Sequence, residues 1–89
     1  MIEHEVEIVN RLGLHARAAA KLVHLAGRFQ CDVKLVKDGD VVDGKSILGL
    51  LMLAAAQGEH VTLRCDGGDE QEAMAALEDL IARRFEEES

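Results

Sequence analysis

The chain has 89 residues, of which 48% are hydrophobic and 30% are charged, which favours one folded globular domain over residues 1–89. Ten Lys and Arg against seventeen Asp and Glu give a net charge of −7, which argues against nucleic-acid or anionic-membrane partners. No apolar run reaches the roughly 18 residues that cross a bilayer, and the acidic N-terminus does not fit a signal peptide. We therefore expect a cytoplasmic protein. Cys31 and Cys65 are too far apart in sequence for a zinc or redox motif, so no metal is expected.

The first half of the chain predicts a strand, a helix and then a hairpin. Strict alternation of apolar and acidic residues predicts a half-buried strand over residues 2–8. Residues 16–27 change to a helical period and end at a glycine. Alternation returns over residues 31–35, and the turn signal Asp38-Gly39 predicts that the chain then reverses into a third strand.

The second half predicts a short helix, a strand and a longer helix. Ser46 stands at an N-cap position before an apolar helix over residues 47–56. Residues 61–65 alternate as a fourth strand. Asp69 should cap the last helix, with Glu72 three residues later completing a pattern similar to a capping box.

The resulting order is βαββαβα, and one-sided alternation of the strands is typical of an antiparallel sheet. All helices must then cover the other face, which predicts an α/β (α+β) open-faced two-layer sandwich with a four-stranded antiparallel sheet and three helices on one face. The acidic tail, residues 86–89, would put negative charge at a helix C-terminus, where the dipole disfavours it, so we expect it to fray.

His15 lies where the N-cap of the first predicted helix belongs, a position that usually holds Ser, Thr, Asp or Asn. The free N–H groups of a first helical turn favour an anion, so a phosphate carried on one ring nitrogen would be well placed. Arg17 could add a charge-assisted, bidentate partner for the phosphate oxygens. The alternative, from residue chemistry alone, is an ordinary loop in which His15 is a poor cap and Arg17 is solvated.

One stripe of the same helix is basic, with residues at i, i+4, i+7 and i+11: Arg17, Lys21, His24 and Arg28. In a chain of net charge −7, this stripe is either a solvated polar face or a docking strip that steers an acidic partner toward His15.

The stretch from Gly39 to Ser46 matches the pattern G-x-x-x-x-G-K-S of nucleotide-binding P-loops. Its interior, however, holds the strand-favouring residues Val41 and Val42 and two acids that would repel a triphosphate. A P-loop also needs a parallel sheet and a distant Mg²⁺-binding acid, for which this antiparallel pattern leaves no room. We therefore reject nucleotide binding.

The helix after Ser46 is apolar on nearly every side, although a two-layer fold can bury only one side. Leu50 and Leu53 could equally be exposed or sunk in the core. Some of the remaining apolar side chains, Ile47, Leu48, Leu51 and Met52, should be exposed close together as a partner surface, for which Ile47, Leu48 and Leu51 are the candidate binding residues.

Two segments, Gly13–Arg17 and Gly44–Leu50, resemble the HPr family, the histidine-containing phosphocarrier proteins of the bacterial phosphoenolpyruvate-dependent sugar phosphotransferase system. The resemblance covers the whole chain. It implies that His15 takes a phosphoryl group on Nδ1 from phosphorylated Enzyme I and passes it to a histidine of an EIIA domain or protein, with assistance from Arg17. Such a carrier is a protein substrate and not an enzyme. We expect a monomer without a cofactor, whose phosphoryl group comes ultimately from phosphoenolpyruvate.

The resemblance further implies that the first helix and the Ser46 helix form the docking surface. Ser46 matches the position that HPr kinase/phosphorylase modifies in many bacteria to control carbon catabolite repression. A phosphate there would lie at a helix N-terminus, where it is tolerated, and its charge would weaken the docking of an acidic Enzyme I.

Ala18 stands where HPr proteins usually have proline, which keeps a nitrogen-branch carrier of the NPr type as the first alternative. Ser46 and the apolar helix after it fit the sugar branch better. A second alternative is a regulatory binding module, but HPr-like regulators of that kind replace the histidine that this chain keeps. A hydrolase that uses His15 as a base would lack a nearby nucleophile.

Overall fold

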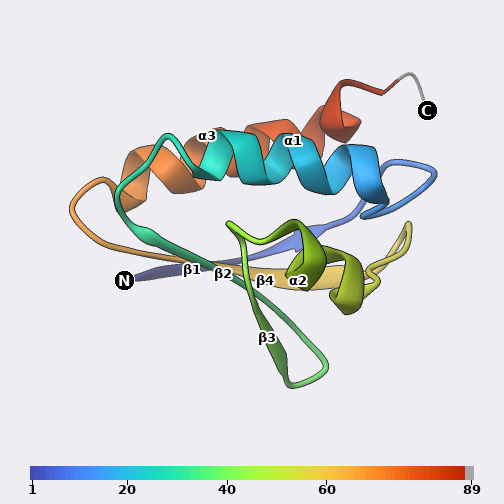
Figure 1. The fold of residues 1–89 in the computed structure, drawn as a ribbon, viewed down its shortest axis with the longest axis horizontal. Coiled ribbons are helices and arrows are strands. Elements are labelled where there is room, and N and C mark those ends of the chain that lie inside the picture. Colours follow the sequence, from blue (N-terminus) through green and yellow to red (C-terminus); the bar gives the residue numbers. More distant parts are fainter. Residues whose placement is uncertain (88–89) are drawn as a thin grey trace.

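The computed structural model of the chain describes residues 1–87. Its elements follow the predicted order: β1 (Ile2–Glu7), α1 (Ala16–Ala26), β2 (Asp32–Lys37), β3 (Asp40–Asp43), α2 (Ile47–Leu53), β4 (His60–Asp66), α3 (Glu70–Ala82) and a short 3₁₀ turn, η1 (Arg84–Glu86). The helices α1 and α3 lie side by side across one face of the sheet, and the turn after α3 comes to the same end of the molecule as the loop before α1 (Figure 1).

The sheet is antiparallel throughout and has the strand order β1-β4-β2-β3. The central strand β4 explains the alternation along the chain, because Val61, Leu63 and Cys65 are buried under the helices while the residues between them are not. The predicted open-faced sandwich is therefore confirmed. Both cysteines are free and buried, and burial raises the pKa of Cys65 to about 11, so its thiol stays protonated at neutral pH.

The core forms where the two long helices pack on the sheet. The helical periods predict two buried apolar stripes, and all their residues are buried except Leu25, which is only partly buried: Ala18, Ala19, Leu22, Leu25 and Ala26 in α1, and Ala73, Met74, Leu77, Leu80 and Ile81 in α3. The small side chains Ala18 and Ala26 are fully buried and let α1 approach its neighbours closely. Phe85 also lies fully buried, although no pattern in the sequence marks it as a core residue.

The helix α2 is shorter than predicted and ends at Leu53 rather than at residue 56. Ala54 has φ = 55°, a left-handed conformation that ends the helix. Leu50 and Leu53 are buried, which settles the alternative that the sequence left open for them.

The predicted capping box at the start of α3 does not form. The side chain of Asp69 caps nothing in its own helix and instead accepts the backbone N–H groups of Gln30 at 2.8 Å and Cys31 at 2.9 Å. The carboxylate therefore ties the start of α3 to the chain entering β2. The hydrogen bond from Gln30, together with that from Cys31, lowers the pKa of Asp69 below its ordinary value.

We expect replacement of Leu50 by Ala to lower the free energy of unfolding by about 2–5 kcal/mol, because it leaves a cavity under α2. Replacement of the neighbouring Leu48, whose side chain is 68% exposed, should change the stability by less than about 0.5 kcal/mol. Urea denaturation of both variants measures the difference. Equal losses of stability in the two variants would contradict the burial of Leu50.

Asp69 should make the stability depend on pH in the acidic range. Because its folded pKa lies below its unfolded value, the stabilisation is complete above the unfolded pKa and is lost as the pH falls through the folded one. Asp69→Asn should therefore be less stable than the wild type at neutral pH, and this difference should shrink in acid. Thermal unfolding across the pH range measures this, with the exposed Asp40→Asn as control. A difference independent of pH would contradict the expectation.

Candidate functional site

The loop before α1 is fixed by close backbone contacts. Gly13 has φ = 65°, and a Cβ atom there would lie 2.4 Å from the carbonyl oxygen of Ala55, so only glycine fits. Leu14 donates its N–H to the same carbonyl at 2.9 Å, and the side chain of Asn10 donates to the Gly13 carbonyl at 2.8 Å. The loop is thereby held against the residues that follow α2, and His15 comes next in the chain.

His15 occupies the N-cap of α1, as predicted, with extended backbone angles. Its ring makes no capping hydrogen bond, and the first turn holds no acidic residue. The first three N–H groups of the helix, on Ala16, Arg17 and Ala18, lack intrahelical partners because they precede the i−4 ladder. The side chain of His15 is 25% exposed, so the ring is half-buried beside a helix end that favours anions.

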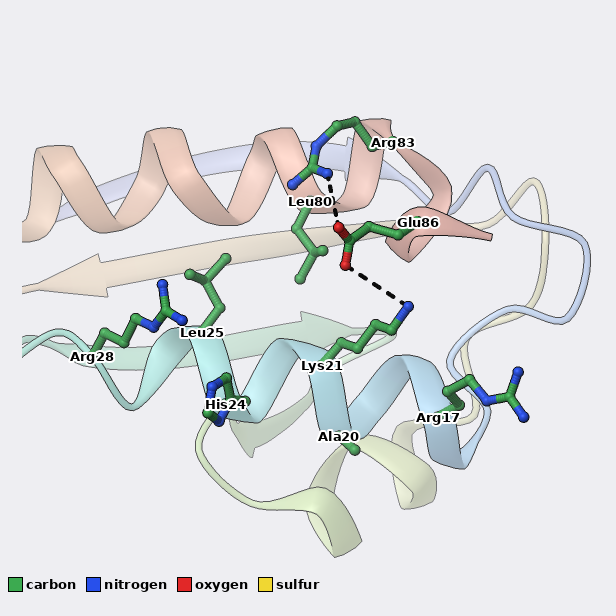
Figure 2. Close-up of a pocket in the computed structure, with 9 residues that line it drawn as sticks. All are labelled: Arg17, Ala20, Lys21, His24, Leu25, Arg28, Leu80, Arg83 and Glu86. Atoms are coloured by element: carbon green, nitrogen blue, oxygen red, sulfur yellow. Dashed lines mark hydrogen bonds and ion pairs between the residues drawn. The ribbon is translucent and has the colours of Figure 1, made fainter. Parts of the chain in front are cut away.

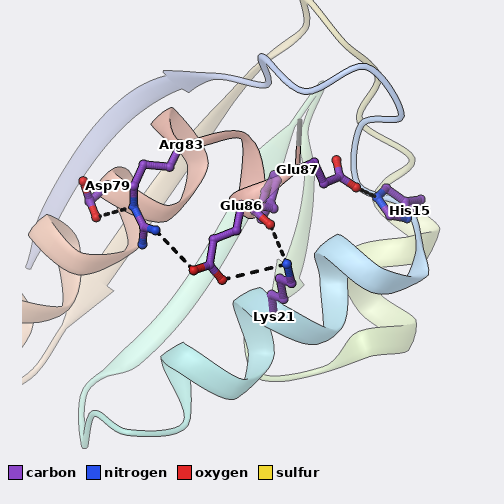
Figure 3. Close-up of polar contacts among 7 residues, drawn as sticks. His15, Lys21, Asp79, Arg83, Glu86 and Glu87 are labelled. Atoms are coloured by element: carbon purple, nitrogen blue, oxygen red, sulfur yellow. Dashed lines mark hydrogen bonds and ion pairs between the residues drawn. The ribbon is translucent and has the colours of Figure 1, made fainter. Parts of the chain in front are cut away.

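The C-terminal segment reaches the ring of His15, contrary to the expected fraying of residues 86–89. The Nε2 atom of His15 contacts the Oε2 atom of Glu87, and the other carboxylate oxygen accepts a hydrogen bond from the Asn10 side chain at 2.8 Å. Figure 3 shows the Glu87 and His15 side chains facing each other between the end of the chain and the start of α1. The expectation is wrong for residues 86 and 87, and its remaining part, residues 88–89, lies outside the described residues.

Glu87 is ionised at neutral pH despite its partial burial. Desolvation would raise the pKa of this carboxyl, but the hydrogen bonds from Asn10 and His15, together with the nearby charge of Lys21, lower it below its ordinary value. An ionised carboxylate can only accept hydrogen bonds.

The basic stripe of α1 borders an open groove of about 570 Å³ between α1 and the end of α3 (Figure 2). Arg17, His24 and Arg28 are exposed, as expected for a solvated face or a docking strip. The prediction that Arg28 continues the stripe on the helix is wrong, because α1 ends at Ala26 and Arg28 lies in the turn that follows. Lys21 differs, because its Nζ atom donates to the Phe85 carbonyl at 2.8 Å and lies 3.8 Å from the Glu86 carboxylate.

Arg17 lies two residues after His15, and Figure 2 shows its side chain directed away from Lys21 at the start of α1. Among residues 1–87 its guanidinium has no hydrogen bond or ion pair, so it is free to bind an anion at this end of the helix. At the far side of the groove, Arg83 is neutralised by Asp79 at 2.8 Å and Glu86 at 3.4 Å.

Ser46 is the N-cap of α2, and its hydroxyl oxygen accepts the N–H of Gly49 at 3.0 Å. The apolar residues predicted to be exposed are indeed exposed, with side chains of Ile47 at 43%, Leu48 at 68% and Leu51 at 38%. Met52 of the same helix is exposed as well, and so is Leu12 in the loop before α1, which the sequence analysis did not single out.

The segment that matches the P-loop pattern folds as the hairpin strand β3 and the turn before α2, within an antiparallel sheet. Within residues 1–87, no three His, Cys, Asp or Glu side chains gather closely enough to hold a metal ion. Over the same residues, no helix is both long and apolar enough to cross a membrane.

Comparison with known proteins accounts for this arrangement. Residues 2–83 match the family model described as the PTS HPr component phosphorylation site. The phosphocarrier protein HPr of Cupriavidus necator is 58% identical over 87 residues, which cover 98% of each chain. The chain belongs to the HPr family. It is accordingly a phosphocarrier of the phosphotransferase system and not an enzyme.

Solved HPr structures share the fold. The crystal structure of HPr from Thermoanaerobacter tengcongensis is 45% identical, covers 100% of both chains and superposes with a TM-score of 0.96. Crh of Bacillus subtilis, described as a catabolite repression containing protein that forms a swapped dimer, is also 45% identical, with a TM-score of 0.77 over 94% of this chain and 97% of its own.

Sequence reasoning missed Glu87 and Asn10 at the HPr site. Asn10 is fully buried between strand and helix, where a polar residue signals an internal hydrogen-bonding role. Glu87 lies in an acidic run that predicts a solvated tail, and no local pattern shows that the chain turns back toward His15.

Proposed function

We propose that His15 is the residue that carries the phosphoryl group, taking it from phosphorylated Enzyme I and passing it to a histidine of an EIIA protein in the cytoplasm. The observation that carries this proposal is the position of the His15 ring at the uncapped start of α1. The free N–H groups there stabilise the negative charge of a phosphate on His15 without bonding to it covalently. The group can therefore be held and then released.

Arg17 assists the transfer in this proposal. Its guanidinium is unpaired within residues 1–87 and lies one turn or less from His15 along α1, so it can approach phosphate oxygens from outside the helix. A planar guanidinium binds two phosphate oxygens at once, which orients the group as well as stabilising its charge.

Docking of both partners is proposed to use two neighbouring surfaces. The exposed apolar side chains of α2 provide the buried centre of an interface, and the exposed basic residues of α1 steer an acidic partner. The helices α1 and α2 pack against each other, so these surfaces are adjacent: Ile47, Leu48 and Leu51 on α2, the partly buried Lys21 and the exposed His24 on α1, and the exposed Arg28 just after α1.

Ser46 is proposed as a regulatory site for a kinase of the HPr kinase/phosphorylase type. Its hydroxyl lies at the start of α2 and is partly exposed, beside Ile47 and Leu48. A phosphate at this position would keep a favourable place at the helix N-terminus while adding negative charge next to the apolar surface. Docking of an acidic partner would therefore weaken without loss of the fold.

Incubation of the wild type with phosphoenolpyruvate and Enzyme I should place one acid-labile phosphate on the protein, because a phosphohistidine N–P bond is broken by acid. His15→Ala should accept none. Phosphate analysis before and after acid treatment, with mass spectrometry to locate the group, measures this. Persistence of the phosphate in His15→Ala would refute the proposed site, and lack of phosphate on the wild type would refute the relay itself.

In the same assay, Arg17→Ala should slow phosphorylation by about 10-fold to 100-fold, because a charge-assisted hydrogen bond contributes about 1.5–3 kcal/mol. Arg28→Ala, which removes the same charge two residues beyond the end of α1, serves as the matched control and should affect the rate through steering alone. The loss of rate in Arg28→Ala should therefore disappear at high salt, whereas the loss of rate in Arg17→Ala should remain. Equal and equally salt-sensitive losses would contradict a specific role for Arg17.

Ser46→Asp should weaken binding to Enzyme I, whereas Ser46→Asn should bind nearly as well as the wild type. Both residues are good N-caps, so the two variants keep α2 and differ in charge. Calorimetric titration with Enzyme I measures the affinity, and circular dichroism checks the fold. Equal binding by the two variants would rule out electrostatic control from this position.

The similarity to Crh keeps a purely regulatory module as the second candidate. The two candidates differ in whether His15 is needed. If His15→Ala left every cellular effect of the protein intact while Ser46→Asp abolished one, the regulatory function would replace the carrier function. The nitrogen branch is distinguished by the receiver, since only an EIIA protein of that branch would then accept the phosphate.

A further inference from the structure

The C-terminal turn of the chain has an unusual backbone. Arg84, Phe85 and Glu86 have φ values of 58°, 54° and 64°, so three successive non-glycine residues adopt the left-handed conformation. This conformation is unfavourable for residues with a Cβ atom and persists only where surrounding contacts hold it. Here Phe85 is fully buried and its carbonyl accepts a hydrogen bond from Lys21 at 2.8 Å. Glu87 follows this turn directly and contacts His15.

The carboxylate of Glu87 is held by two donors. Its Oε1 atom accepts from the Asn10 side chain at 2.8 Å, and its Oε2 atom contacts Nε2 of His15. Asn10 is fully buried and uses its amide group to bind both Gly13 and Glu87, while its own Oδ1 atom has no partner within the described residues. A buried oxygen without a hydrogen bond lowers the stability of the fold. The Asn10 amide therefore keeps the orientation that binds Glu87 at the expense of stability.

The direction of the contact follows from the charge of Glu87. A carboxylate offers no proton, so Nε2 of His15 must be the donor. In the neutral ring, the lone pair then lies on Nδ1. A nitrogen that bears a proton cannot attack phosphorus, whereas one with a lone pair can.

We propose that Glu87 is a positioning residue for His15, which keeps the proton on Nε2 and leaves Nδ1 as the nucleophile. This inference rests on the proposed role of His15. During transfer, the Nδ1 lone pair forms the new N–P bond while the N–P bond of the donor histidine breaks and its electron pair returns to the donor ring. Nε2 keeps its proton throughout. The phosphorylated ring is an imidazolium whose positive charge faces the Glu87 carboxylate, and transfer to the receiver reverses these steps.

Nitrogen-15 NMR of the His15 ring tests the proposal in the wild type without any substitution. At a pH where the ring is neutral, the proton should lie on Nε2. A proton on Nδ1 would overturn the proposal directly.

Glu87→Gln tests the consequence for transfer, because the amide keeps the shape but can also donate, so it no longer selects one tautomer. We expect the Nδ1–H form to become detectable. We also expect kcat for phosphorylation by Enzyme I to fall about 10-fold to 100-fold with little change in KM, because the amide no longer places a negative charge opposite the imidazolium that forms on phosphorylation. Glu86→Gln is the matched control. It removes the same charge one residue earlier, from a side chain that contacts Lys21 and Arg83 instead of His15, and its rate should stay within about twofold of the wild type.

Equal losses in the two variants, or an unchanged rate in Glu87→Gln, would overturn the positioning role. These outcomes are distinct from failure of the proposed function, in which the wild type itself would take no phosphate on His15.

Discussion

The position of His15 depends on one close approach between two backbones, that of Gly13 to Ala55. The carbonyl of Ala55 lies where a side chain at residue 13 would begin, and it accepts the N–H of Leu14. This contact joins the loop before α1 to the loop after α2, which are distant in sequence. It fixes the direction in which α1 starts, and it places the exposed surface of α2 beside the helix that His15 begins. A residue larger than glycine would separate these two loops and so alter the site and the neighbouring surface together.

Charge is distributed unevenly over the molecule. The chain as a whole has a net charge of −7, yet the groove between α1 and α3 is lined by five basic side chains and one acidic one: Arg17, Lys21, His24, Arg28, Arg83 and Glu86. Part of this positive charge is neutralised internally, because Lys21 and Arg83 both bind Glu86. Among residues 1–87, no acidic side chain pairs with Arg17 or Arg28, so the unpaired positive charge of the groove lies on these two residues. The groove therefore concentrates positive charge near the two ends of α1, in a chain whose net charge is negative.

The C-terminal segment shows how tertiary contacts reverse a local preference. Glutamates after a helix C-terminus are disfavoured by the helix dipole if they continue along its axis. In this protein α3 ends at Ala82, and the left-handed turn that follows carries the chain away from that axis. The glutamates then meet cations and donors of other elements, with Glu86 beside Lys21 and Glu87 beside His15. The partners of these glutamates belong to α1 and the loop before it. The sequence around residue 86 therefore gives no sign of these contacts.

The sequence by itself determined the order and type of the elements, because apolar periodicity, the turn at Asp38-Gly39 and the N-caps at His15 and Ser46 are local signals. It also indicated the family, since the residues that carry the resemblance lie in two short continuous segments, 13–17 and 44–50. Tertiary structure alone decided which residues meet. Asp69 binds the chain entering β2 instead of capping α3, and Ala54 stops α2 early. Glu87 reaches His15 across 72 residues of sequence. These outcomes depend on contacts between segments that are brought together only when the sheet and helices pack, and a local pattern holds no information about them.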